Sequence, residues 1–352
     1  MPDTIYRMPA EWEKQSMIWL GWPHNRADWP GKFGPVPWAF AEMIRYISYS
    51  QRVGLLVKDE VRRREAVDAL EDVGIDLSRV DIVMQPTNRG WLRDCGPIFV
   101  HRGDTKALVA LDWRFNAWAK YSNWQKDNAV PEGLCDLLNI ERVQPHWPLH
   151  QKTKRLVLEG GAIDVNGAGT LITTEECLLS PDIQVRNAGF TRQDYEACFA
   201  YWLGAKHVIW LEKGIIGDDT HGHVDDIARF VNPTTVVCAV EKDPGDANYA
   251  LLQVNLARLK NATDQDGTRL TVIELPMPRP LFFEGHRLPA SYANFLITNQ
   301  YVLVPTFNDP ADRVALSILA ECFPEREVVG IHAVDLVWGL GTLHCLTQQM
   351  PL

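Results

Sequence analysis

The chain has no apolar run approaching about 18 residues, the least that a membrane-spanning helix requires. Its first residues, MPDTIYRMPAEWEKQ, also lack the basic start and the apolar stretch of a signal peptide. The composition, 46% hydrophobic and 23% charged over 352 residues, is that of a globular protein able to bury a large core. We therefore expect a cytoplasmic protein with no membrane partner.

A disulfide framework is absent as well, because the seven cysteines are odd in number and scattered, with no CxxC pair. Four of them lie in patterns typical of helices or strands, where a buried, unreactive thiol is the ordinary outcome: Cys135, Cys198, Cys238 and Cys322. Cys345 differs, since it follows His344 in the terminal stretch GLGTLHCLTQQMPL. Chain ends are usually frayed, so a reactive pair there implies that the segment folds back onto a site.

A positive balance of charge is also missing. The sequence has 35 Lys and Arg against 45 Asp and Glu, which gives a formal net charge of −10. Nucleic-acid binding depends on a basic face, so we expect no nucleic-acid partner. A negative field would instead help to concentrate a small cationic substrate.

No linker or change of composition divides the chain, and we expect a single domain over residues 1–352. Within it, four stretches predict β-hairpins by alternation and turn residues: 95–113, 161–179, 223–240 and 293–307. Each is followed by an amphipathic helical stretch and another short apolar run. The start of the chain, residues 16–57, is a partial copy. The predicted fold is therefore α/β, with a strand-strand-helix-strand unit appearing about five times.

Four polar residues stand at or just before the first strand of these hairpins. Asp94, Glu159, Asp225 and Asn294 follow one another at separations of 65, 66 and 69 residues. If the units surround an axis, this spacing brings the four residues to one central point. Coincidence within an ordinary α/β protein is the alternative that spacing alone leaves open.

Two of the acids lie beside aromatic residues or glycines. Asp94, in GWLRDCGP, is either half of a solvated pair with Arg93 or a pocket carboxylate beside Trp91. A carboxylate presents two acceptor oxygens, which suit the forked N–H groups of a guanidinium. Glu159, in LVLEGGAIDV, ends an apolar run before two glycines that permit close approach of a ligand. Glu159 is therefore a stronger candidate than an ordinary surface acid.

The segment DDTHGHVDDIARF, residues 218–230, has three interpretations. On a strand, His221, His223 and Asp225 would share one face and resemble the ligands of a metal-dependent amidohydrolase. Alternatively, His223 moves protons while Asp225 binds substrate, as the ordinary pKa of histidine allows. The third interpretation is a polar turn. Cys345 favours acid–base chemistry, because a thiol next to histidine and acids suits covalent attack better than metal binding.

Further motifs occur in order along nearly the whole chain: MPAEWE, WLGWP, WLRDCGP, DWRFNAW, LEGG, HGHVDD, SYANF and HCLTQQ. With them the sequence resembles the agmatine deiminase family, which includes bacterial peptidylarginine deiminase-like proteins, within the guanidine-modifying pentein superfamily. The resemblance implies a five-fold pseudosymmetric α/β propeller. It also implies hydrolysis of agmatine to N-carbamoylputrescine and ammonia, a step toward putrescine, with no metal or organic cofactor.

Carried over by motif, Cys345 matches the nucleophile and His223 the general acid/base. Asp94 and Asp225 match the acids that bind the guanidinium, and Glu159 matches a further acid of the site. Trp91 and Trp113 match aromatic walls of the substrate slot; together with Trp118 they favour an apolar passage for a methylene chain. A thiouronium intermediate on Cys345 would follow.

The sequence departs from the family pattern at two places. The stretch before Cys345 reads GLGTLHC, with Leu340 and Thr342 where the family commonly has Gly and Asn, and THGH places His221 where Asn is common. The outer pocket is therefore altered. Peptidylarginine deimination, a metal-dependent amidohydrolase and a non-catalytic binder of arginine-like cations stay as alternatives, and a homodimer is an open expectation.

Overall fold

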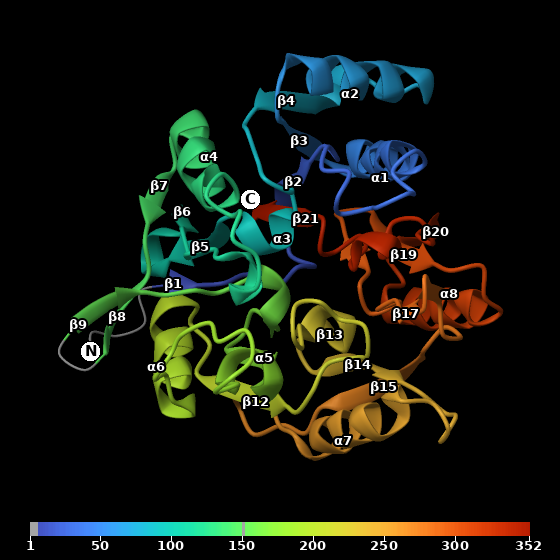
Figure 1. Ribbon diagram of the computed structural model, residues 1–352. Helices are drawn as coiled ribbons and strands as arrows, with labels where there is room; N and C mark the ends of the chain where they lie inside the picture. The colour runs from blue at the N-terminus through green and yellow to red at the C-terminus, as the bar shows by residue number, and fades with distance from the viewer. Residues whose placement is uncertain (1–5, 150–151) are drawn as a thin grey trace.

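Small sheets surround the centre of the molecule in the computed structural model, with helices on the outside (Figure 1). The structure describes residues 6–149 and 152–352. The N-terminal stretch that lacks the features of a signal peptide therefore lies partly outside the described residues, at residues 1–5. No helix within the described ranges is long and apolar enough to cross a membrane.

Four of the sheets contain the predicted hairpin, helix and returning strand. Their strands are β5 (Ile98–Arg102), β6 (Ala107–Leu111), β7 (Glu141–Val143); β10 (Asp164–Val165), β11 (Thr170–Thr174), β12 (His207–Leu211); β13 (Ala228–Asn232), β14 (Thr235–Val240), β15 (Thr271–Pro276); β18 (Leu296–Ile297), β19 (Tyr301–Thr306), β20 (Glu327–His332). The helices before the third strands are α4 (Val130–Leu138), α6 (Arg192–Trp202), α7 (Asn248–Asn261) and α8 (Ala311–Cys322). A short helix, α5 (Glu175–Leu179), precedes α6, and a short strand, β1 (Tyr6–Arg7), extends the first sheet. The four predicted units are confirmed.

Strand direction follows one order in all four sheets. The first two strands pair antiparallel through a tight connection, and the third pairs parallel with the second. A parallel pair requires a crossover, and the intervening helix supplies it. The start of each first strand is thereby directed to the middle of the molecule, where the polar residues named above reside.

A further sheet joins the two ends of the chain. Strands β2 (Gln15–Gly21), β3 (Arg52–Val57) and β4 (Val80–Met84) pair parallel, with helices α1 (Val36–Ser50) and α2 (Glu60–Asp72) between them. The C-terminal strand β21 (Thr347–Pro351) pairs antiparallel with β2. The partial unit at the start of the sequence is thus completed by the last residues, and Cys345 is held two residues before β21.

Two small hairpins lie outside this scheme: β8 (His146–Leu149) with β9 (Lys152–Arg155), and β16 (Phe282–Phe283) with β17 (His286–Arg287). All seven cysteines are free, and all except the partly exposed Cys322 are buried. Cys135, Cys198 and Cys322 lie in helices and Cys238 in a strand, as predicted.

Gly54 makes room for the packing of the sheet that joins the chain ends. It pairs with Trp19 across β2 and β3, and a Cβ atom at Gly54 would lie 2.2 Å from Cε3 of Trp19. Trp19 is 1% exposed and belongs to the main hydrophobic cluster, so its indole has no free space to move into. Only a glycine fits opposite this tryptophan without displacing it.

Gly54→Ala is therefore expected to lower the free energy of unfolding by about 1–3 kcal/mol, the usual cost of overpacking a core. Urea unfolding followed by tryptophan fluorescence measures the change. Gly34→Ala is the matched control, because a Cβ there would meet no atom within 4 Å. Equal midpoints for the two variants would contradict the packing argument.

Candidate active site

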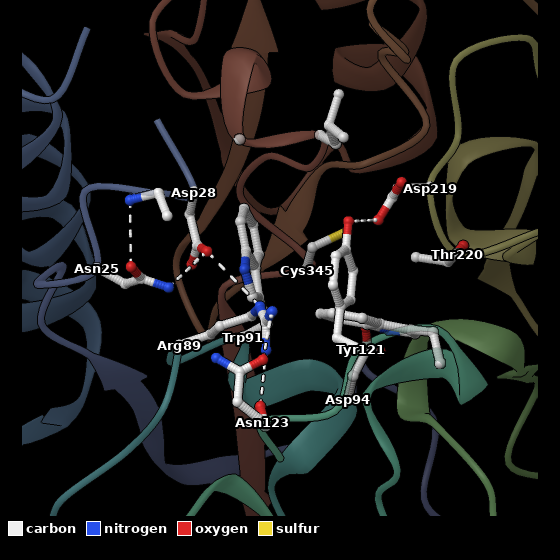
Figure 2. Close-up of a pocket in the computed structure, with 14 residues that line it drawn as sticks. Asn25, Asp28, Arg89, Trp91, Asp94, Tyr121, Asn123, Asp219, Thr220 and Cys345 are labelled. Atoms are coloured by element: carbon white, nitrogen blue, oxygen red, sulfur yellow. Dashed lines mark hydrogen bonds and ion pairs between the residues drawn. The ribbon is translucent and has the colours of Figure 1, made fainter. Parts of the chain in front are cut away.

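Cys345 and Asp94 line one cavity of about 250 Å³ (Figure 2). Trp91 and Trp118 contribute aromatic surface to the same wall, and Leu340 contributes aliphatic surface. The rings of Trp91 and Trp29 stack with centroids 5.4 Å apart, which fixes the plane of Trp91. The cavity therefore offers a thiol, a carboxylate and flat apolar surfaces to a small molecule.

Asn294 holds the thiol of Cys345 in place. Its Nδ2 donates to Sγ at 3.1 Å, and its Oδ1 accepts from the backbone N–H of His344 at 3.1 Å. The other contact of Sγ is Oδ2 of Asp225, at 3.5 Å. Burial raises the pKa of the thiol well above its ordinary value, and the negative charges of Asp225, Asp226 and Asp94 raise it further. In the empty site the sulfur is therefore protonated.

Asp94 comes from the short helix α3 (Leu92–Cys95) and faces the cavity with both oxygens occupied. Oδ2 accepts from Nε1 of Trp118 at 2.9 Å, and Oδ1 accepts from the backbone N–H of Gly161 at 3.1 Å. Burial raises the pKa of this carboxyl to about 6, although His223 opposes the shift. The interpretation of Asp94 and Arg93 as a solvated pair is wrong, because both side chains are buried.

His223 lies behind Asp94, fully buried between two acids. Its Nδ1 is 3.7 Å from Oδ1 of Asp94, and its Nε2 is 3.9 Å from Oε2 of Glu159. Burial lowers the pKa of this imidazole, but Asp94, Cys177 and Glu159 outweigh burial and raise it well above its ordinary value. His223 is therefore a proton donor in the empty site.

Glu159 keeps its charge in spite of complete burial. Its Oε1 accepts from Nε of Arg186 at 3.0 Å, while Oε2 has no hydrogen-bond partner among the described residues. Burial on its own would raise the pKa of this carboxyl, but Arg186 and His223 lower it to about 2. Glu159 thus supplies a permanent negative charge to His223.

Asp225 lies in the 3-10 helix η6 (Val224–Asp226), between a histidine and the thiol. Its Oδ2 accepts from Nδ1 of His344 at 2.7 Å, and Oδ1 accepts no hydrogen bond from the described part of the chain. Burial would raise the pKa of Asp225, but His344 and His223 lower it. The carboxylate is therefore charged, with one oxygen free to accept an N–H from a ligand.

These groups converge on Gly161. A Cβ atom there would lie 2.5 Å from Nδ1 of His223 and 3.0 Å from one oxygen each of Asp225 and Asp94. The predicted convergence of Asp94, Glu159, Asp225 and Asn294 on one central region is confirmed by these distances and by the contacts of Asn294 with Cys345. Asp225, Glu159 and His223 lie behind the wall of the empty cavity, which Asp94 and Cys345 form.

Trp113 does not form a wall of the cavity, which corrects the prediction. It is buried in a separate hydrophobic cluster with residues such as Ile98, Trp147 and Leu156. Trp118 occupies the wall instead, because residues Ala117 to Ala119 adopt left-handed backbone angles, φ 50°, 57° and 54°. This turn directs the Trp118 indole N–H to Asp94. The residues of the turn, Ala and Trp, ordinarily have negative φ angles, so the sequence does not reveal it.

His344 and Asp226 also belong to this cluster of contacts. His344 was expected only as the partner of Cys345 in a reactive pair, and Asp226 had no expected role of its own. Nε2 of His344 is 2.8 Å from Oε2 of Glu11, so the imidazole bridges Glu11 and Asp225. Asp226 accepts from Nδ2 of Asn294 at 3.0 Å and thereby orients the amide that holds Cys345. The proximity of His344 to Cys345 in sequence was the available signal, but its ring points to the two acids.

The strand interpretation of residues 221–225 is wrong. His221 has a φ of 66° and is half-buried in a turn, and residues 224–226 form a 3-10 helix. In the described parts of the chain, two groups of side chains could hold a metal ion. One is Glu159 with Cys177 and His223, and the other is Asp225 with Asp226 and Cys345. His221, His223 and Asp225 do not converge, so the ligand set of the amidohydrolase alternative has no geometric support.

Comparison with known proteins finds relatives over nearly the whole length of the chain. The family model for Porphyromonas-type peptidyl-arginine deiminase matches residues 7–351. The agmatine deiminase of Stutzerimonas stutzeri is 37% identical over 369 residues, which cover 98% of this chain and 95% of the relative.

Solved structures are similar over the full length. An agmatine deiminase of Enterococcus faecalis has a TM-score of 0.88 at 32% identity, covering 100% of this chain and 98% of its own. A substrate-bound variant of the C. jejuni agmatine deiminase has a TM-score of 0.86 at 29% identity, covering 99% and 97%. This protein has their mixed α/β fold and belongs to the family of Porphyromonas-type peptidyl-arginine deiminases and agmatine deiminases.

Proposed function

We propose that this protein hydrolyses agmatine to N-carbamoylputrescine and ammonia through a covalent intermediate on Cys345. The observation that supports this most directly is the placement of the Cys345 sulfur and the Asp94 carboxylate on one cavity, with His223 buried directly behind Asp94. The full-length similarity to agmatine deiminases supports the same substrate.

Two acids would position the guanidinium of the substrate. Asp94 presents a carboxylate on the cavity wall. Behind the wall, Asp225 contacts the thiol through Oδ2 and has an unpartnered Oδ1. Carboxylates accept guanidinium N–H groups in fixed, often bidentate geometry. Holding the central carbon next to Sγ converts the attack into a step within one complex, which lowers the barrier.

The substrate cation would also help to ionise its nucleophile. Asp225, Asp226 and Asp94 raise the pKa of Cys345, and the positive guanidinium opposes their effect when it binds. The thiol loses its proton to solvent, and the thiolate then forms a bond to the guanidinium carbon. His223 gives its proton to the departing nitrogen, ammonia leaves, and a thiouronium remains on Cys345.

Hydrolysis would reverse the role of His223. The imidazole, now neutral, takes a proton from water as the oxygen bonds to the thiouronium carbon. The bond from carbon to Sγ breaks, the thiolate returns, and the ureido product loses its extra proton to solvent. Glu159 and Asp94 favour the protonated imidazole before the first step and after the second, because both are acids close to its ring.

Peptidyl-arginine is the second candidate substrate, because the matching family model is described by that activity. A cavity of about 250 Å³ fits a small molecule better than a folded chain. Ammonia release from agmatine, free arginine and a peptidyl-arginine separates these candidates.

We also propose that the repeated units form a five-fold pseudosymmetric propeller. The support is the common strand order of the four hairpin sheets and the completion of another by β21. A cytoplasmic location and a homodimer stay predictions.

Cys345→Ser is expected to abolish turnover, since a serine hydroxyl is scarcely ionised at neutral pH and is a poor nucleophile. Mass spectrometry of the wild-type protein, quenched during turnover with agmatine, should show an adduct on Cys345. Cys95→Ser is the matched control, because Cys95 is buried outside the cavity lining. An adduct on another cysteine, or an active Cys345→Ser variant, would refute the assignment.

His223→Ala should slow turnover by about a hundred-fold or more while leaving KM nearly unchanged, the usual scale for a lost general acid and base. His221→Ala is the control, since that histidine is half-buried and outside the cavity lining. Steady-state kinetics on agmatine measure both. Equal losses in the two variants would mean that His223 has no special role.

Asp94→Asn should lower kcat/KM by an amount equivalent to about 3–5 kcal/mol, because it leaves a buried cation without its partner. The pKa of Asp94 is raised to about 6, so the carboxylate is present above that pH and is lost below it. In the wild type, kcat/KM should therefore fall as the pH drops below about 6, while the guanidinium stays charged. The decline should be absent in Asp94→Asn, and its persistence there would assign it to another group.

A further inference from the structure

Asp28 is a buried carboxylate on the same cavity as Cys345, outside the cluster that would perform the chemistry. Its side chain is 8% exposed. Oδ1 accepts from Nδ2 of Asn25 at 2.9 Å, whereas Oδ2 accepts no hydrogen bond of normal geometry within residues 6–149 and 152–352. Burying a carboxylate oxygen without a partner costs free energy, so such a group in a cavity wall indicates a missing ligand.

Arg89 is the nearest cation to Asp28, but it is already occupied. Its Nε lies 3.6 Å from Oδ1 of Asp28, and Figure 2 shows its two terminal nitrogens turned to Asn123. These nitrogens donate to the backbone oxygen and to Oδ1 of Asn123, both at 2.9 Å, and the guanidinium covers the ring of Tyr121 at 4.4 Å. Arg89 therefore neither reaches Oδ2 of Asp28 nor presents a free fork to a substrate carboxylate.

The other two carboxylates that line the cavity have both oxygens engaged. Asp94 accepts from Trp118 and Gly161. Asp219 accepts from the hydroxyl of Tyr121 at 2.8 Å and from Nζ of Lys120. Among these three lining acids, Asp28 is the one with an unused oxygen.

Asp28 differs from the acids around Cys345 both in its surroundings and in its hydrogen-bond partners. Asp28, Asp219 and Leu340 also line an adjoining hollow, so they stand where the two cavities meet. Leu340 holds a left-handed φ of 67°, a strained angle for a leucine, and it places an aliphatic side chain at this junction. Between Cys345 and Asp28 the walls include Trp91 and Leu340, which suit a methylene chain.

We propose that Asp28 binds a second positive charge of the substrate, the ammonium at the end of the chain opposite the guanidinium. This inference rests on the proposed deiminase function and defines its substrate class: a guanidinoalkylamine, positive at both ends. The ammonium donates a hydrogen bond to Oδ2 of Asp28, and the methylene groups lie against Trp91 and Leu340.

The charge state of Asp28 agrees with this role. Burial raises the pKa of its carboxyl to about 7, Arg89 and the nearby indole N–H of Trp91 lower it, and Asp127 raises it again. A bound ammonium favours the ionised carboxylate and so lowers this pKa. A substrate with a neutral or negative end gains nothing from Asp28.

The test compares agmatine with n-butylguanidine, which has the same chain without the ammonium, and with 4-guanidinobutanoate, which ends in a carboxylate. Ammonia release gives kcat/KM for each. In the wild type we expect agmatine to exceed n-butylguanidine by about ten- to a hundred-fold, the scale of one charged hydrogen bond, and 4-guanidinobutanoate to be the poorest substrate. In Asp28→Asn the advantage of agmatine should fall to within about threefold, while n-butylguanidine keeps its rate.

Asp219→Asn is the matched control, because it removes a charge from the same cavity and both oxygens of Asp219 are already paired. This variant should lower kcat/KM for agmatine and for n-butylguanidine alike and keep the ratio of the two values. If Asp28→Asn does not fold, the wild-type protein still tests the inference: equal kcat/KM for agmatine and n-butylguanidine overturns it. An unchanged ratio in Asp28→Asn also overturns it, with deiminase chemistry intact. Failure of the wild type on every guanidine overturns the proposed function instead.

Discussion

The buried contact of His344 with two carboxylates is the interaction on which the site depends. Nδ1 of His344 is 2.7 Å from Asp225, and Nε2 is 2.8 Å from Glu11. Glu11 is in turn 2.5 Å from Nη2 of Arg229. Three segments that are far apart in the sequence are joined by this chain of charges: the N-terminal segment, the third hairpin and the C-terminal residues. Because an unpaired buried charge is costly, no member can leave without penalising the others.

This network determines where Cys345 lies and how it behaves. Asp225, held by His344, is 3.5 Å from the sulfur, and Asn294, held by Asp226, is 3.1 Å from it on another side. A burial that would be unfavourable for each charge alone becomes tolerable because the groups are paired. The same pairing leaves Oδ1 of Asp225 without a hydrogen bond from the described residues. The site is therefore organised for a cation before any cation arrives.

Environment, more than residue type, separates the roles of the acids. Burial raises the pKa of Asp94 to about 6 and that of Asp28 to about 7, whereas Arg186 and His223 lower the pKa of Glu159 to about 2 in spite of burial. Glu159 is thus a fixed charge beside His223, whereas a bound cation would lower the pKa of Asp94 and of Asp28. A negative cavity with one acid near the thiol and another where the two cavities meet matches a molecule that is positive at both ends.

The sequence by itself determined the order of elements and indicated the candidate reacting residues. Alternation and turn residues such as NPTT and TNQ predict the hairpins, because strand pairing across a tight turn depends on neighbouring residues. The motifs around Cys345, His223 and Asp94 indicated their chemistry by resemblance, and their convergence followed from the spacing of the units.

Only the tertiary structure decided which side chains meet. The pairing of β21 with β2 joins residues more than 300 apart, and no local pattern predicts such a contact. Trp118 rather than Trp113 reaches Asp94 because of a left-handed turn at 117–119. The unpartnered oxygen of Asp28 likewise exists only because Arg89 is held by Asn123. Local sequence sets backbone periodicity, whereas burial and pairing of charges depend on segments that folding brings together.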